Sequence, residues 1–133
     1  MAGLINKINR FETQVLEVKD LTPTVKHITF STCEGFVHNA GQFFTLFFEK
    51  DGEKFRRPYS IASTTRDGEI ELCVKIVEGG RASSIFSEMK KGDRFNCMGP
   101  LGRFTFKQTS NGVVFICTGT GIAPFRAMIP ELL

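Results

Sequence analysis

Residues 42–63, QFFTLFFEKDGEKFRRPYSIAS, decide the fold that this sequence predicts. Gln42 to Glu49 contains four phenylalanines and has the composition of a strand. Asp51-Gly52 follows it, and this pair favours a two-residue hairpin because both central turn positions need a positive φ. Arg57 to Ser63 again has the character of a strand. The stretch therefore predicts two antiparallel strands joined by a tight turn.

Short strands separated by turn residues are predicted over most of the remaining chain. Ile70 to Val77 alternates apolar and polar side chains, as a half-buried antiparallel strand does, and Asp67-Gly68 before it repeats the hairpin signal. The other predicted strands are Phe11 to Lys19, Val25 to Ser31, Arg94 to Met98 and Phe104 to Lys107. About six short strands with hairpins between them favour an antiparallel barrel or sandwich.

One helix is predicted to interrupt the strands. Ser83 or Ser84 can cap its start, and Gly92 can end it. The apolar residues of its predicted buried stripe are Ile85, Phe86 and Met89.

The character of the sequence changes after Asn111-Gly112. Val113 to Cys117 is apolar throughout, which predicts a strand buried on both faces, as in a parallel sheet. Gly119 to Gly121 then makes a turn, and Ile122 to Leu133 is predicted to be helical. Such a strand and helix open an α/β nucleotide-binding domain. We expect a first domain over residues 1–110 and an incomplete βα unit over residues 111–133.

Length and composition narrow the class of protein. The chain has 133 residues, of which 41% are hydrophobic and 23% charged, and its net charge is +3. This length fits one domain and part of a second, and the charge is too weak to favour a nucleic-acid partner. The N-terminus lacks an apolar run long enough for a signal peptide, and Gly, Pro, Arg and Glu interrupt the apolar C-terminal stretch. A cytoplasmic protein without a membrane span is predicted.

The four cysteines are too far apart in sequence for a CxxC metal site, so no bound metal is predicted. Cys73, Cys97 and Cys117 each lie in apolar, strand-like runs, where buried free thiols are common. Free thiols are typical of a reducing compartment.

Two segments carry groups that suit a nucleotide-like ligand. Arg57 offers a planar set of donors for a phosphate, Tyr59 a flat face, and Ser60 hydrogen bonds to a ring nitrogen, which together suit a flavin. The alternative is an ordinary edge strand with a surface arginine. Gly79-Gly80 before the predicted helix suits a pyrophosphate, because a helix N-terminus gathers free N–H groups. The alternative there is a simple capped helix after a glycine turn.

The order of five motifs resembles the ferredoxin–NADP reductase family of flavoproteins. RPYS at 57–60 is followed by VK at 74–75, GGxxS at 79–83, GPxGxF at 99–104 and GTGIAPF at 119–125. Pro124 stands where GxGxxG would have its third glycine, so the usual dinucleotide fingerprint is incomplete. The resemblance implies a six-stranded antiparallel Greek-key barrel with one capping helix, followed by the first strand and helix of an α/β domain for NAD(P)H.

The resemblance also implies a role for each matching residue. Arg57 would contact the flavin phosphate, Tyr59 would stack on the isoalloxazine, and Ser60 would be catalytic beside N5, where hydride arrives. The backbone of residues 73–75 would line the cofactor, and residues 81–83 would hold its pyrophosphate. The implied cofactor-binding residues are Arg57, Pro58, Tyr59, Ser60, Cys73, Val74, Lys75, Gly80, Arg81, Ala82, Ser83, Gly119, Thr120 and Gly121.

A flavin-dependent oxidoreductase is the function that the resemblance implies, with this chain as its FAD-binding part. NAD(P)H would reduce FAD, with FMN as the alternative flavin, and electrons would pass to a metal centre or another acceptor such as a redox protein. Two further alternatives stay open. One is a non-catalytic flavin module or electron-transfer subunit that needs a partner for nicotinamide, and the other is a barrel without cofactor that serves as an interaction domain. Dimerisation through the C-terminal part is also expected.

Overall fold

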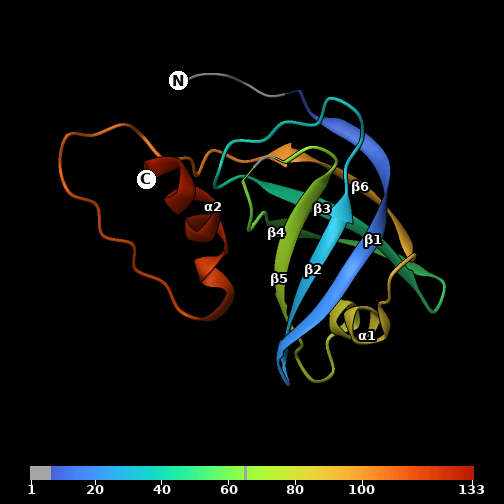
Figure 1. Ribbon diagram of the computed structural model, residues 1–133. Helices are drawn as coiled ribbons and strands as arrows, with labels where there is room; N and C mark the ends of the chain where they lie inside the picture. The colour runs from blue at the N-terminus through green and yellow to red at the C-terminus, as the bar shows by residue number, and fades with distance from the viewer. Residues whose placement is uncertain (1–6, 65) are drawn as a thin grey trace.

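The computed structural model of the chain describes residues 7–64 and 66–133. Six strands and a helix are followed by a short 3₁₀ helix and a second α-helix (Figure 1). The strands are β1 (Asn9–Thr22), β2 (Val25–Ser31), β3 (Phe43–Lys50), β4 (Glu53–Ser60), β5 (Glu69–Lys75) and β6 (Arg94–Leu101). The helical elements are α1 (Arg81–Glu88), the 3₁₀ helix η1 (Gly119–Ile122) and α2 (Ala123–Leu132).

The six strands form one antiparallel sheet in the order β4-β3-β6-β1-β2-β5. β1 is long enough to pair with β6 through residues 9–14 and with β2 through residues 15–22. This change of partner, together with the natural twist of strands, coils the sheet and turns its edge strands β4 and β5 toward each other. The antiparallel barrel with one capping helix is therefore confirmed.

The core combines inward-facing strand residues with one side chain of α1. Phe44, Leu46 and Phe48 of β3 are buried, and so is Phe86 of α1. The ring of Phe86 meets the rings of Phe48 and Tyr59 edge-on, at centroid distances of 5.7 and 5.2 Å. Because a buried phenylalanine contributes about 1.5–3 kcal/mol, Phe86 is the main attachment of α1 to the barrel. The helix lies at one end of the barrel (Figure 1), where Phe86 contacts Tyr59 of β4.

The two predicted hairpin turns differ in conformation. Asp51 and Gly52 both have positive φ, at 53° and 74°, so the mirror-image turn predicted between β3 and β4 is confirmed. At Asp67-Gly68 only the glycine has a positive φ, of 79°. The turn before β5 is therefore of a different type from the first.

Two predicted strands near the C-terminal end are wrong. Residues 104–107 and 113–117 form neither strand nor helix. The side chains of Val114 and Ile116 are 84% and 85% exposed, and Cys117 is exposed rather than buried. A strand is stabilised by backbone hydrogen bonds to a neighbouring strand, and no described residue pairs with residues 113–117. Apolar composition alone therefore does not make this segment a strand.

The predicted serine cap of α1 is also wrong. Gly80 occupies the N-cap position, and no side chain caps the helix. The Ser83 hydroxyl instead accepts a hydrogen bond of 2.8 Å from the backbone N–H of Val77, and the Ser84 hydroxyl donates one of 2.7 Å to the Arg81 carbonyl. Ser83 thus fixes the loop that leads into the helix.

The predicted C-terminal helix is confirmed as α2, which lies outside the barrel (Figure 1). Ala127 and Met128 of α2 are buried with Ala40, in a second small apolar cluster. Gly41 allows the neighbouring backbone to come close, because a Cβ atom there would lie 1.8 Å from the carbonyl oxygen of Phe104, and also 2.6 Å from Met128 Cε. The helix is therefore attached to the barrel by apolar packing on the Ala40-Gly41 segment.

Within residues 7–64 and 66–133, no helix has the length and apolar character needed to cross a bilayer. The same residues contain no group of three or more His, Cys, Asp or Glu side chains that could hold a metal ion. All four cysteines are free thiols.

Candidate functional site

A seam separates β4 from β5, the two edge strands of the sheet, and it is closed at one end. The backbone N–H of Ala62 donates to the carbonyl of Glu71 at 2.8 Å, and the N–H of Glu71 donates to the Ser63 hydroxyl at 3.1 Å. The first is a backbone bond of the kind that joins antiparallel strands, and the second ties the Ser63 side chain to β5, so together they close the seam at this end.

Neighbouring residues of the same segments turn their backbone groups away from the seam. The N–H of Ile61 donates to the Gln42 carbonyl at 3.0 Å, and the N–H of Ile76 donates to the Thr24 carbonyl at 2.7 Å. Because backbone groups alternate sides along a strand, only every second residue of β4 and β5 faces the seam.

Beyond its closed end the seam is open and lined by backbone polar groups. The register of the closing pair sets Ser60 opposite Cys73 and Pro58 opposite Lys75, but β4 and β5 are not paired there in the described sheet. By alternation, Ser60 and Cys73 direct their backbone N–H and C=O groups into this opening. Pro58 has no N–H to leave unpaired, which suits an edge position. The open seam therefore offers hydrogen bonds to a flat, polar ring system.

Two guanidinium groups meet at the ring of Phe55, on β4. The Cζ atom of Arg57 lies 5.1 Å from the ring centroid and that of Arg81, the first residue of α1, lies 4.5 Å from it. Glu53 pairs with Arg81 at 2.7 Å, whereas Arg57 donates to the Arg56 carbonyl at 2.9 Å and has no ion pair within the described residues. A free positive charge beside a helix N-terminus suits a phosphate group.

A cavity of about 300 Å³ lies at the start of α1. Gly79 and Gly80 line it, and a Cβ atom at Gly79 would meet nothing within 4 Å, so the backbone is accessible there. Lys50 and Ser84 also line the cavity, and the Lys50 ammonium contacts the Ser84 hydroxyl. Glycine backbone, a cation and a hydroxyl at a helix start together suit a pyrophosphate.

Tyr59 presents a half-buried aromatic ring next to Ser60. Its ring packs edge-on against Phe86 at 5.2 Å. Burial raises the pKa of the Tyr59 hydroxyl to about 12, although the positive charge of Arg57 acts to lower it. The side chain is therefore a neutral aromatic surface at physiological pH.

An alkaline titration tests this environment, because Tyr59 is the only tyrosine and the chain has no tryptophan. We expect phenolate absorbance to appear with a midpoint near 12 rather than at the ordinary value of 10.0. The folded protein then holds this proton more tightly than the unfolded chain, so the associated stability is complete below pH 10 and is lost as the pH rises through 12. A midpoint at 10 in the folded protein would show that the ring is solvated.

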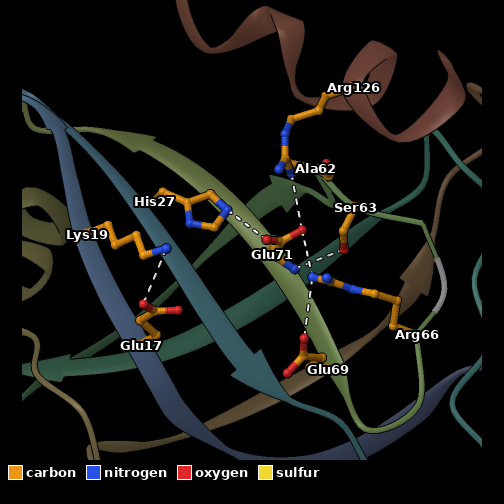
Figure 2. Close-up of polar contacts among 9 residues, drawn as sticks. All are labelled: Glu17, Lys19, His27, Ala62, Ser63, Arg66, Glu69, Glu71 and Arg126. Atoms are coloured by element: carbon orange, nitrogen blue, oxygen red, sulfur yellow. Dashed lines mark hydrogen bonds and ion pairs between the residues drawn. The ribbon is translucent and has the colours of Figure 1, made fainter. Parts of the chain in front are cut away.

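The Gly119–Gly121 turn lies on the same side of the barrel as the seam. These residues belong to η1, which contacts β5, and Thr120 is half-buried. Arg126 of α2 reaches the closed end of the seam, where its Nη1 atom donates to the Ala62 carbonyl at 2.8 Å (Figure 2). The turn is thus held near the segments predicted to bind the flavin ring.

The structure brings the predicted site residues together from four segments of the chain. Residues 57–60 and 73–75 flank the seam, residues 80–83 begin α1 at its open end, and residues 119–121 lie against β5. The side chain of Val74 points into the core, so only its backbone can meet a ligand. The cofactor roles of all these residues stay predictions.

The sequence did not predict three residues that contact the site at the start of α1, namely Phe55, Lys50 and Glu53. The signal for Phe55 was present, because it lies two residues before Arg57 and therefore on the same face of β4. Phe55 also pairs with Phe48 across the hairpin that the sequence predicted. The contact with Arg81 had no such signal, since it joins segments more than twenty residues apart.

An antiparallel barrel with an open polar seam at its edge, and with cations gathered where a capping helix begins, suits a domain that binds a phosphate-bearing cofactor such as a flavin nucleotide. Residues 12–106 match the oxidoreductase FAD-binding domain family. The chain belongs to this family, and within it to the flavoproteins that resemble ferredoxin–NADP reductase.

Curated relatives and a solved structure agree with this assignment. The chain is 36% identical over 124 residues to ferredoxin–NADP reductase B of Sorangium cellulosum, which covers 90% of this chain and 50% of the relative. It is 34% identical over 117 residues to the reductase component of phenol 2-monooxygenase from a Pseudomonas species, covering 86% of this chain and 33% of the relative.

One similar solved structure is a ferredoxin NADP+ reductase from Neisseria gonorrhoeae with bound FAD and NADP. It superposes with a TM-score of 0.73 at 27% identity, over 92% of this chain and 52% of that one. The chain thus spans about half of the first relative, about half of this structure and a third of the monooxygenase component.

Proposed function

We propose that this chain binds FAD along the seam between β4 and β5 and takes part in electron transfer from NAD(P)H to an acceptor. The observation that carries the proposal is the meeting of Arg57 and Arg81 at Phe55, where α1 begins beside the open seam. The two ends of this site fit the two ends of the cofactor. A polar seam suits the flavin ring, and the cationic helix start suits the pyrophosphate.

When bound, FAD would supply the redox chemistry, and the protein would supply position and charge. Arg57 would bind a phosphate, and the backbone of residues 80–83 would bind the other at the start of α1. Tyr59 would cover one part of the ring and exclude water. The Ser60 hydroxyl would donate a hydrogen bond to a ring nitrogen and so orient the ring in the seam.

The acceptor is proposed from the relatives. One relative is named as a reductase of ferredoxin and another as the reductase component of a monooxygenase. We therefore infer a redox protein or a metal centre as the acceptor. FAD rather than FMN is supported by the cavity of about 300 Å³ at the start of α1, which can receive a second phosphate.

Rapid mixing of the FAD-loaded chain with NADH or NADPH tests the electron transfer. We expect the absorbance of oxidised flavin to disappear with one of the two nucleotides. Retention of oxidised FAD with both nucleotides would overturn direct reduction by this chain and favour a second function, that of a flavin module whose nicotinamide site comes from a partner. The observation that favours this second candidate is that residues 113–117 form no sheet and that Val114, Ile116 and Cys117 among them are exposed.

The domain division is also a proposal. We infer a boundary between residues 110 and 111, supported by the end of the family match at residue 106 and by the irregular segment before η1. A cytoplasmic location stays a prediction from the sequence.

Self-association through the C-terminal part is expected from its exposed apolar side chains. Val114 and Ile116 are almost fully exposed, and Phe104 is 60% exposed. Exposed apolar side chains of this size favour association. Light scattering should therefore give a mass that rises with protein concentration, and the variant Ile116→Glu should lower it. A monomeric mass at every concentration would contradict this expectation.

A further inference from the structure

Glu71, in the middle of β5, gathers side chains from three other segments (Figure 2). Its Oε1 atom lies 3.0 Å from Nε2 of His27 on β2, although this contact lacks hydrogen-bond geometry. Its Oε2 atom lies 2.8 Å from Nη2 of Arg66 and 3.2 Å from Nη1 of Arg126. The Glu71 side chain is only 13% exposed. A shielded carboxylate therefore joins the barrel to α2.

Arg126 binds both sides of the seam at once. The same Nη1 atom that contacts Glu71 donates to the carbonyl of Ala62 at 2.8 Å. Ala62 is in turn hydrogen-bonded through its N–H to the Glu71 carbonyl. The guanidinium of Arg126 therefore contacts both residues that close the seam, Ala62 and Glu71. Ala62 lies two residues after Ser60, and Glu71 lies two residues before Cys73.

We propose that Arg126 and Glu71 are positioning residues that fix the Gly119–Ile122 turn relative to the flavin seam. The inference rests on the proposed function, because the seam is taken as the flavin site. Arg126 is the fourth residue of α2, about one helical turn from its start. When its guanidinium is held at Glu71 and Ala62, the first turn of α2 and the preceding η1 are held in place as well.

The ionic contact has a role distinct from that of the apolar packing of α2. Ala127 and Met128 attach the helix to the Ala40-Gly41 segment. Apolar packing is non-directional, whereas a guanidinium hydrogen-bonded to a carboxylate and a carbonyl is directional. Packing therefore holds α2 on the barrel, and the Arg126 contacts set the orientation in which it is held.

The charge balance around Glu71 supports this role. Burial acts to raise the pKa of the Glu71 carboxyl, but the hydrogen bond and charge of Arg126, and then the charges of Arg66 and His27, outweigh it and lower the pKa. The carboxylate is thus ionised at neutral pH, and its removal would leave two guanidinium groups facing each other.

Hydrogen–deuterium exchange of peptides covering residues 119–132 tests the proposal in the full chain. We expect Glu71→Gln and Arg126→Gln each to speed exchange there by roughly threefold to tenfold, and the double variant to add little, because the two residues act as a pair. The matched control is Glu69→Gln, which also removes a carboxylate beside Arg66 but does not touch Arg126. Wild-type exchange rates in both single variants, or additive effects in the double variant, would overturn the proposal.

A spectroscopic measurement separates positioning from stability. In Glu71→Gln loaded with FAD, we expect the visible flavin bands to shift toward those of solvated flavin, while the FAD dissociation constant stays within about twofold of the wild type. Loss of FAD affinity together with a lower melting temperature, and no band shift, would instead assign Glu71 a purely structural role. If the wild type binds no FAD, the proposed function fails, and the exchange experiment still decides whether the pair holds the turn.

Discussion

Replacing Arg57 by alanine is expected to weaken FAD binding about 10- to 100-fold, because hydrogen bonds from a charged group contribute roughly 1.5–3 kcal/mol. The stacking of Arg57 on Phe55 at 5.1 Å holds the side chain in place without neutralising it. Its charge is therefore available to a phosphate at the start of α1. A titration of the variant with FAD, followed by flavin fluorescence, gives the dissociation constant.

Lys54→Ala is the matched control for this variant. Lys54 carries the same charge on the same strand and is exposed, but it lies three residues before Arg57 and so on the opposite face of β4. Its loss should change the FAD dissociation constant by less than about twofold, since exposed charges contribute little. Equal dissociation constants for the two variants would contradict the phosphate role of Arg57.

Replacing Phe86 by alanine is expected to lower the free energy of unfolding by about 3–5 kcal/mol, the usual effect of removing a buried phenylalanine ring. Phe86 is fully buried and its ring contacts those of Phe48 and Tyr59. The variant would therefore loosen both the attachment of α1 and the ring of Tyr59, which packs on Phe86 beside the seam. FAD affinity should fall together with stability, as followed by urea unfolding and FAD titration.

Phe104→Ala provides the same chemical change at an exposed position. The Phe104 side chain is 60% exposed, and its ring lies 5.9 Å from that of Phe125, centroid to centroid. Its removal should change the free energy of unfolding by less than about 1 kcal/mol. If Phe86→Ala is no more destabilising than Phe104→Ala, then Phe86 is not the main attachment of α1 to the barrel.

The barrel was predictable from the sequence because the features that define its strands and turns depend on residues close together in the chain. The predicted strand Val25 to Ser31 agrees residue for residue with β2, and Asp51-Gly52 adopts the positive φ angles that the predicted hairpin requires. The alternation over Ile70 to Val77 likewise predicts which side chains of β5 face the core. Strand period and turn chemistry are properties of neighbouring residues, so a single sequence carries them.

Features that depend on distant segments could not be predicted in the same way. Residues 113–117 have the composition of a buried strand, but a strand also needs a partner, which composition does not specify. Ser83 has the chemistry of a helix cap, yet its hydroxyl instead accepts a hydrogen bond from the backbone N–H of Val77 in the preceding loop. The contact of Arg81 with Phe55 and that of Arg126 with Glu71 each join segments that only the folded barrel brings together.

Titration of the purified chain with FAD tests the central claim most directly. Isothermal titration calorimetry of the wild type should give saturable binding of one FAD per chain, and tighter binding of FAD than of FMN, because the start of α1 offers a second phosphate site. Arg57→Ala, measured alongside, should bind more weakly. The absence of saturable FAD binding by the folded wild type would contradict the assignment of the β4–β5 seam as a flavin site.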